Sequence, residues 1–397
     1  MEESYREIIM KIKIIFISAV VFFPILTLTI SCSHQKAEWK GTIGEENGVT
    51  IVKNPKEPMY DEGMISLKED LSIGVDEGDE NYMFSYPFDI DSDSHGNIYV
   101  LDFTERTIKK YDNQGVFQKN LGRKGQGPGE FERPYGFCIN AQDLIYVADS
   151  RKIEVLNSDG IYQKAIRLKN SIEQISINNK NELIIHCSES TQEDEDTRRR
   201  MSKIGKYDTQ NDKLEYFFSK KKPLFRDIQS EEYRIRIPYE RFDTDPKGNV
   251  YIGTTNEYEI LVYSPDGDLM MRFSREYTPI PIDREIKAKA MKQLSKSGFR
   301  INLQEYEKLI DCHPIFGSIS TDENDRVWIR LFQLLGEDDV REYTSFDVFS
   351  SEGKYLFGVK INRDILGQPV FKNGYVYTLA RNESGYSRAL RLKIIEH

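Results

Sequence analysis

The sequence predicts an all-β fold, a six-bladed β-propeller whose blades are four-stranded antiparallel sheets. A short strand rich in β-branched and aromatic residues follows a turn six times, as in GNIYVLD from Gly96 and DRVWIRL from Asp325. Glycine-containing hairpin turns follow most of these strands. The last repeat lacks one strand, and an alternating segment near the N-terminus can supply it. Together these observations predict a closed ring of repeated blades.

Each repeat consists of four consecutive strands joined by tight turns. An apolar strand such as PFDIDSD (Pro87–Asp93) precedes the β-branched strand, and TIKKYDNQG from Thr107 contains the third. The turns Asn-Gln-Gly, Ser-Asp-Gly and Pro-Asp-Gly are typical of hairpins, because glycine reaches the positive φ that a tight turn needs. A fourth strand, such as VFQKNLG from Val116, completes the unit.

The repeats are unevenly spaced, which we attribute to two insertions. One is the charged stretch Ser188–Arg200. The other, at about 283–311, carries helix signals: Asp283 can cap the helix REIKAKAMKQL, and Tyr306 and Ile310 share one face of a second helix. We expect a small helical insertion that acts as a lid or packs against the ring.

Closure of the ring is predicted from the two ends of the chain. The last repeat, QPVFKNGYVYTLARNESGYSRALRLKII, has three strands before His397. A propeller closes its ring so that no sheet edge remains open. We therefore expect the alternating segment Met64–Gly74 to complete the last blade, so that the propeller spans residues 63–397.

The first 32 residues have the features of an export signal. Lys11 and Lys13 precede the apolar run Ile14–Ile30, which Cys32 follows. The stretch LTISC resembles the lipobox of bacterial lipoproteins, in which the cysteine is acylated. We predict a signal peptide at 1–32, lipidation of Cys32 and a tether or leader at 33–62. The protein is then exported and anchored to the bacterial outer membrane, facing the periplasm or the surface; one uncleaved anchor helix is the alternative.

Composition limits the classes of partner. With 65 acidic and 55 basic residues the formal net charge is -10, whereas binding to nucleic acid needs clustered positive charge. We therefore expect no nucleic-acid partner. Besides Cys32, the cysteines are Cys138, Cys187 and Cys312, and none is in a CxxC pair. No zinc knuckle, redox motif or disulfide framework is predicted, and we expect a monomer.

The segment Gly122–Asp149 carries a family resemblance. Its sequence, GRKGQGPGEFERPYGFCINAQDLIYVAD, follows the pattern GxGxGPGxF, proline, apolar strand and IYVAD strand, and it resembles the NHL-repeat propellers. Residues 39–60 resemble the leader of six-bladed propeller lipoproteins of Bacteroidetes. The resemblance implies a platform that binds proteins, RNA or glycans. A few such propellers are enzymes, for example the amidating lyase and lactonase-type hydrolases, and these hold a metal in the channel.

The glycine-rich stretch Gly122–Pro134 could also be a phosphate-binding loop. Such a loop follows a parallel strand and opens a helix, and neither is predicted beside this stretch. We interpret it instead as the connector from the outer strand of the first blade to the inner strand of the second.

The predicted binding site is a basic rim on one face of the ring. Connections between blades share this face with the loops between second and third strands, and arginine recurs there. Its planar guanidinium suits carboxylate, sulfate or phosphate. The predicted binding residues are Arg106, Arg123, Lys124, Arg133, Tyr135, Arg151, Arg241, Arg330 and Arg381. Alternatively, each arginine pairs with a neighbouring aspartate, such as Asp102 or Asp149, and links the blades.

The sequence predicts no cofactor. A zinc site needs about three converging ligands, and of the five histidines only His186 and His313 lie where they could contribute. We expect His186 to be structural, and calcium remains open because its oxygen ligands leave little trace in a sequence. The favoured function is ligand binding without catalysis, to an anionic glycan, a peptide or a protein. Alternatives are a metal-dependent lyase or lactonase-type hydrolase in the channel, and a scaffold for another envelope protein.

Overall fold

The computed structural model describes residues 38–397 except 62, 179, 193–197, 209–210, 223–226, 231–233, 297–302 and 335–340. The chain divides into two units, residues 1–38 and 39–397, and the second contains the described strands and helices. The predicted signal peptide and Cys32 lie outside the described residues.

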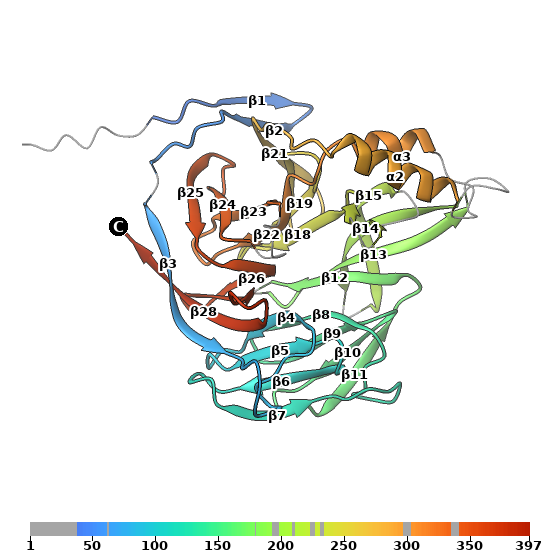
Figure 1. Ribbon diagram of the computed structural model, residues 1–397, viewed down its shortest axis with the longest axis vertical. Coiled ribbons are helices and arrows are strands. Elements are labelled where there is room, and N and C mark those ends of the chain that lie inside the picture. The colour runs from blue at the N-terminus through green and yellow to red at the C-terminus, as the bar shows by residue number, and fades with distance from the viewer. Residues whose placement is uncertain are drawn as a thin grey trace, which may run out of the picture. The chain divides into compact units, whose positions relative to one another are not determined.

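The described strands form the predicted ring of six blades, each built on four antiparallel strands (Figure 1). The first three blades are β4 (Pro87–Ser92), β5 (Ile98–Asp102), β6 (Thr107–Tyr111) and β7 (Phe117–Leu121); β8 (Pro134–Ile139), β9 (Ile145–Asp149), β10 (Lys152–Leu156) and β11 (Tyr162–Arg167); β12 (Ser171–Ile177), β13 (Leu183–Gln192), β14 (Arg198–Asp208) and β15 (Lys213–Lys222). The first strand of each blade lies innermost and contacts the first strands of both neighbouring blades.

The other three blades follow the same order around the ring. They are β18 (Glu240–Thr244), β19 (Val250–Thr254), β20 (Glu259–Tyr263) and β21 (Leu269–Arg275); β22 (Phe316–Thr321), β23 (Val327–Leu331), β24 (Thr344–Phe349) and β25 (Tyr355–Ile361); β26 (Asp364–Lys372), β27 (Tyr375–Arg381), β28 (Ser387–Glu396) and β3 (Ile65–Ile73). The charged insertion at Ser188–Arg200 falls on β13 and β14, except for its gap at 193–197.

The predicted closure of the ring is confirmed. β3 pairs antiparallel with β28, from Ile73 opposite Ala389 to Ile65 opposite Glu396. Ile65 and Ile73 are buried in two different apolar clusters, one on each side of the last blade. The N-terminal strand therefore fills the edge that the C-terminal strand leaves open.

A repeated aspartate explains why the sequence motif recurs. Asp93 accepts hydrogen bonds from the main-chain nitrogens of His95 (3.0 Å) and Asn97 (2.9 Å), which fixes the turn between β4 and β5. Its other oxygen accepts from the hydroxyl of Tyr99 at 3.0 Å. Asp245 with Tyr251 and Asp322 with Trp328 repeat this arrangement. The spacing from aspartate to aromatic residue thus fixes both the turn and the first residues of the next strand.

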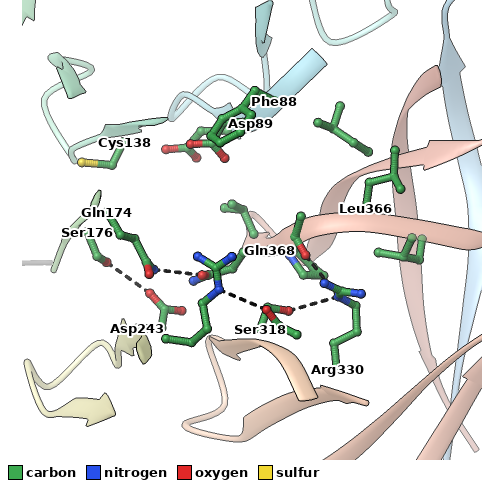
Figure 2. Close-up of a pocket in the computed structure, with 18 of the residues that line it drawn as sticks. Phe88, Asp89, Cys138, Gln174, Ser176, Asp243, Ser318, Arg330, Leu366 and Gln368 are labelled. Atoms are coloured by element: carbon green, nitrogen blue, oxygen red, sulfur yellow. Dashed lines mark hydrogen bonds between the residues drawn. The ribbon is translucent and has the colours of Figure 1, made fainter. Parts of the chain in front are cut away.

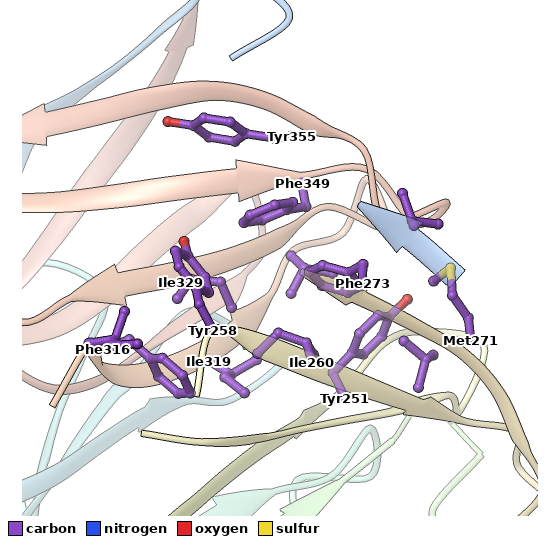
Figure 3. Packing of buried hydrophobic residues seen from close by; sticks show 14 residues of the cluster. Tyr251, Tyr258, Ile260, Met271, Phe273, Phe316, Ile319, Ile329, Phe349 and Tyr355 are labelled. Atoms are coloured by element: carbon purple, nitrogen blue, oxygen red, sulfur yellow. The ribbon is translucent and has the colours of Figure 1, made fainter. Parts of the chain in front are cut away.

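Aromatic side chains fill the space between blades. Figure 3 shows the cluster between the blades of β18–β21 and β22–β25, where the rings of Phe273 and Phe349 are 4.9 Å apart. Tyr258 and Phe316 lie in the same cluster. Because these side chains are buried against two blades at once, they stabilise the ring as well as the individual sheets.

A hairpin from the N-terminal segment extends the fourth blade. β1 (Thr42–Glu46) pairs with β2 (Val49–Asn54), and β2 pairs in parallel with β21. These strands fall within residues 33–62, which the sequence assigns to the tether. Val52 is buried in the cluster between the fourth and fifth blades.

The helical insertion is present and has its own small core. Asp283 caps α2 (Arg284–Ser295), since its carboxylate accepts from the main-chain nitrogens of Glu285 and Ile286. α2 and α3 (Leu303–Leu309) bury Tyr306 and Ile310 against the hairpin of β16 (Asp227–Gln229) and β17 (Arg234–Arg236). Both segments connect consecutive blades, so they lie at the end of the ring where the inner strands begin.

The stretch Gly122–Pro134 connects the first two blades, as predicted: β7 ends at Leu121 and β8 begins at Pro134. Gly122 has a φ of 71°, and a Cβ there would lie 2.3 Å from the ring of Phe131. Phe131 is buried between the two blades. Glycine is therefore required for both the backbone conformation and the close approach of this ring.

Candidate binding site in the central channel

The central channel contains a cavity of about 1300 Å³. Inner strands of all six blades contribute to its wall, and residues from both ends of these strands line it. A second cavity of about 1100 Å³ adjoins it beside the second and third blades and shares Tyr86, Tyr135, Tyr239 and Arg241 with it. We call the end where the inner strands begin the basic end, for the arginines that gather there.

Aspartates of the inner strands hold neighbouring blades together. Asp89 accepts from the main-chain nitrogen of Phe137 (2.9 Å), and Asp243 accepts from that of Thr321 (2.9 Å). Both carboxylates therefore supply hydrogen-bond acceptors to main-chain N–H groups at the strand edges that face the channel. Burial raises the pKa of Asp89 to about 7 and that of Asp243 to about 6, against the opposing effect of these hydrogen bonds.

Amide side chains connect further blades across the channel. Gln174 donates to the carbonyl of Phe242 at 2.7 Å and to the side chain of Gln368 at 2.9 Å. Figure 2 shows Gln174 and Asp243 on one side of this cavity and Arg330 on the other. The wall is therefore polar, and much of its hydrogen bonding is used to link blades.

The basic end concentrates arginines. Arg241 donates through Nε to the carbonyl of Gly317 (3.1 Å), and Arg330 donates to that of Gly367 (3.1 Å). Within the described part of the chain, neither forms an ion pair with a carboxylate. Arg236 and Arg341 line the same cavity. Burial, together with the nearby positive charge of Arg341, lowers the pKa of Arg330 to about 10.

Tyr239 lies within this group of arginines. The guanidinium of Arg241 is 4.5 Å from the centre of its ring. Burial alone would raise the pKa of Tyr239, but the charges of Arg241 and Arg236 lower this pKa to about 8. This phenol is therefore held in a strongly positive environment.

An aromatic cluster borders the same two cavities. The ring of Phe88 is 6.2 Å from that of Tyr86 and 5.8 Å from that of Phe103, which is 6.0 Å from Tyr135. Tyr86 is 55% exposed and Phe88 39% exposed. Tyr86, Phe88 and Tyr135 line both cavities, so aromatic faces are available next to the arginines.

The structure brings together some of the predicted binding residues. Tyr135, Arg241, Arg330 and Arg381 line the channel cavity. The adjoining cavity contains Arg133 and Arg151, as well as Tyr135 and Arg241. Arg106, Arg123 and Lys124 line neither of these cavities.

The alternative interpretation of the arginines holds in part: Arg381 pairs with Asp364 at 3.7 Å, whereas the two aspartates named as examples have other donors. Asp102 accepts from the main-chain nitrogens of Ser85 and Tyr86, and Asp149 accepts from that of Glu132. Both aspartates are buried and bind the chain that enters their own blade. Arg241 and Arg330 do link blades, but through carbonyl oxygens.

Sequence reasoning missed two arginines of the basic end. Arg236 stands in YRIRIPYERF, where arginine alternates with isoleucine, and Ile235 and Ile237 are buried. This alternation could have predicted a strand that presents its arginines on one face. No local pattern in the sequence marks Arg341. Its position depends on an ion pair with Asp364 (2.6 Å) of the next blade, which the sequence does not reveal.

The histidines differ in setting. His186 is buried, lies 2.7 Å from the Ser202 hydroxyl, and has a pKa lowered to about 4 by burial, which supports a structural role. His313 stacks on Phe332 with ring centres 5.3 Å apart. Among the described residues, no three His, Cys, Asp or Glu side chains are placed to hold a metal ion. The metal-dependent alternative therefore gains no support from them.

Comparisons with known proteins agree with this fold. Residues 83–241 match the model of a family described as a 6-bladed beta-propeller, DUF5128. A structure of a candidate exported protein from Bacteroides fragilis is 13% identical with a TM-score of 0.50; the match covers 87% of this chain and 100% of that one. A member of the DUF4221 family from Bacteroides vulgatus is 11% identical with a TM-score of 0.51, over 84% and 99% of the two chains.

A search of curated proteins found no match to the sequence. In the described part of the chain, no helix has the length and hydropathy needed to cross a bilayer. The resemblances to NHL repeats and to lipoproteins stay predictions. The sheet order, the closing strand and the family match together establish the fold as a six-bladed β-propeller.

Proposed function

We propose that this protein binds an acidic glycan at the basic end of the channel and catalyses no reaction on it. The observation that carries the proposal is the pair of arginines, Arg241 and Arg330, which lie in the cavity wall without a carboxylate partner among the described residues. Arg330 is only 9% exposed.

Buried positive charge favours an anionic ligand at this end of the channel. Removing a cation from water costs several kcal/mol unless an anion or several hydrogen bonds compensate it. The carbonyls of Gly317 and Gly367 use one nitrogen of each guanidinium and carry no full charge. A carboxylate or sulfate in the cavity would accept from the remaining nitrogens and neutralise the repulsion between the arginines.

The aromatic cluster favours a glycan over a peptide. Tyr86 and Phe88 are exposed and Tyr135 is half-buried, and all three line the cavities that the arginines line; aromatic faces of this kind stack on sugar rings. A sugar acid would place its ring on this cluster and its charge on the guanidiniums. The similarity to a Bacteroides protein named for export, and the predicted Cys32 anchor, support a location in the cell envelope.

The test uses purified residues 38–397 and titration calorimetry. Uronic-acid oligosaccharides should bind, and their neutral counterparts should bind at least about tenfold more weakly, as expected for a charge-assisted pair. Arg241→Ala and Arg330→Ala should each weaken binding by about tenfold or more. Arg123→Ala is the matched control, since Arg123 lines neither cavity and pairs with Glu130 at 2.8 Å.

Two results would overturn the proposal. The first is equal binding of acidic and neutral sugars. The second is a loss of stability in the Arg241 and Arg330 variants without any loss of binding. Binding of acidic peptides but not of glycans would instead identify the ligand as a protein segment. Metal-dependent turnover of a bound sugar or lactone would favour the enzymatic alternative.

A further inference from the structure

Tyr239 lines the channel cavity together with the arginines of the basic end. Arg241 of β18 lies over its ring, Arg236 of β17 is three residues earlier in the chain, and Arg330 of β23 comes from the next blade. The positive charge of each of these arginines lowers the pKa of the Tyr239 phenol. Three elements of the chain therefore contribute positive charge to the part of the cavity that Tyr239 lines.

We propose that Tyr239, Arg236, Arg241 and Arg330 form a subsite for one carboxylate or sulfate group, in which the ligand anion and the ionised Tyr239 phenol exclude each other. This inference rests on the proposed function and assigns a position to the ligand's acidic group. The physical basis is that a single positive region cannot favourably hold two anions within a few ångströms of each other.

The sign of the expected pH dependence follows from the direction of the Tyr239 shift. With a pKa of about 8, the phenol is neutral below that pH and negative above it. Above pH 8 each bound anion must be accompanied by uptake of one proton on Tyr239. Linkage then requires affinity to fall by up to about tenfold per pH unit. Reciprocally, a bound anion raises the pKa of Tyr239.

Other groups at the site titrate as well. Asp89 loses its proton near pH 7, and Arg330, whose pKa is lowered to about 10, begins to lose its charge at the top of the range. Arg200 lines the adjoining cavity, and Glu173 lines both cavities. Arg341 is paired with Asp364 at 2.6 Å, and Glu240 is paired with Lys222 at 2.7 Å. Burial lowers the pKa of His313. A Tyr239→Phe variant keeps all these groups and isolates the contribution of the phenol.

The first measurement compares anion binding in residues 38–397 and in Y239F from about pH 6 to about pH 10. The probes are glucuronate and inorganic sulfate, with glucose as the neutral reference. In the unmodified protein affinity should fall by up to about tenfold per unit above about pH 8, and in Y239F this part of the slope should be absent. Preference for glucuronate over sulfate would indicate a sugar-acid ligand, and the reverse a sulfated one.

The second measurement needs no ligand. The difference in ultraviolet absorbance between the unmodified protein and Y239F reports ionisation of Tyr239 alone. Its midpoint should lie near pH 8, should rise when glucuronate saturates the site, and should rise in Arg236→Gln. Tyr162→Phe, at a tyrosine that lines neither cavity, is the matched control.

The outcomes separate the two proposals. Anion binding with the same pH profile in both proteins, or a Tyr239 midpoint unaffected by glucuronate, overturns this inference and leaves the proposed function standing. Absence of binding to glucuronate, sulfate and acidic oligosaccharides at any pH overturns both. If Y239F does not fold, the difference in absorbance between the unmodified protein with and without saturating glucuronate decides the question: loss of tyrosinate absorbance near pH 8 on binding supports the inference, and no difference overturns it.

Discussion

At the scale of single residues, a glycine determines where one guanidinium can lie. A Cβ on Gly317 would be 2.5 Å from Nη2 of Arg330, while the carbonyl of the same residue accepts from Arg241. Gly317 therefore allows both arginines to approach the same point of β22. The clash would involve the far end of a flexible side chain, so it can be relieved without moving the backbone.

This contact gives a prediction about binding. Gly317→Ala should displace the guanidinium of Arg330 and weaken binding of acidic ligands by about tenfold, the cost of roughly one charge-assisted hydrogen bond. Calorimetry measures the loss, and thermal unfolding should change little. Gly358→Ala is the control, because its Cβ would meet nothing closer than the Tyr355 hydroxyl at 3.6 Å. Equal affinities in the two variants would contradict the prediction.

Asp89 and Asp243 predict a pH dependence of stability. Their pKa values are about 7 and about 6 in the folded protein, above the usual value near 4 in an unfolded chain. The native state therefore holds more protons than the unfolded state between these limits, so this contribution to stability declines as pH rises from about 4 to about 7.

Replacing both aspartates tests that contribution. Asp89→Asn with Asp243→Asn keeps an acceptor oxygen and removes the charge, so the melting temperature of this variant should depend less on pH between about 4 and about 7. Thermal unfolding at several pH values measures it. A variant profile parallel to that of the unmodified protein would show that neither carboxylate has a raised pKa.

At the scale of elements, one side chain fixes the N-terminal hairpin to two blades. Asn54, at the end of β2, accepts from Trp39 (2.8 Å) and from the main-chain nitrogen of Tyr355 (2.7 Å). It donates to the carbonyls of Ser274 (2.9 Å) and Gly353 (2.8 Å). All four hydrogen bonds of this buried amide are made, so the hairpin is attached by specific contacts as well as by strand pairing.

Removing this amide should destabilise the whole unit. Asn54→Ala leaves buried main-chain groups without partners and should lower the free energy of unfolding by about 2–4 kcal/mol. Denaturation by urea measures the change. Asn113→Ala, at an exposed turn position, should cost less than about 0.5 kcal/mol. If the two variants were equally stable, the hairpin would not contribute to the folded unit.

At the scale of the whole molecule, the ring depends on both ends of the chain. Chains that begin at residue 38, 63 or 75 should decrease in stability in that order. The first contains all the described strands. The second lacks the β1–β2 hairpin, and the third also lacks β3. Without β3, the edge of β28 and the apolar clusters beside it are exposed, so this chain should self-associate.

Size-exclusion chromatography and urea denaturation test this series. The chain from residue 63 is the matched control, because it differs from the shortest chain only by β3 and its flanking residues. A monomeric chain from residue 75, with the stability of the chain from residue 63, would contradict the role given to closure.

Local patterns in the sequence were enough to predict the repeated blade and the number of blades. Turn residues, the recurring β-branched and aromatic strand and strand alternation act within about a dozen residues, so they can be recognised without knowing the fold. The unpaired final strand also revealed its partner, because a sheet edge must be satisfied. By the same local logic, Asp283 predicted the start of α2 and Gly122–Pro134 a connector.

The sequence did not predict which side chains share the site; only the folded ring shows this. Arg236, Tyr239, Arg241 and Arg330 come from connectors and strands of different blades, and their distance depends on how the ring closes. Arg106, Arg123 and Lys124 have the same chemistry in the sequence but lie outside both cavities. The parallel pairing of β2 with β21 was also hidden, because the fourth repeat already has its four strands and no missing strand pointed to a partner. Local hydrogen bonding is encoded locally, whereas charge proximity depends on the assembled ring.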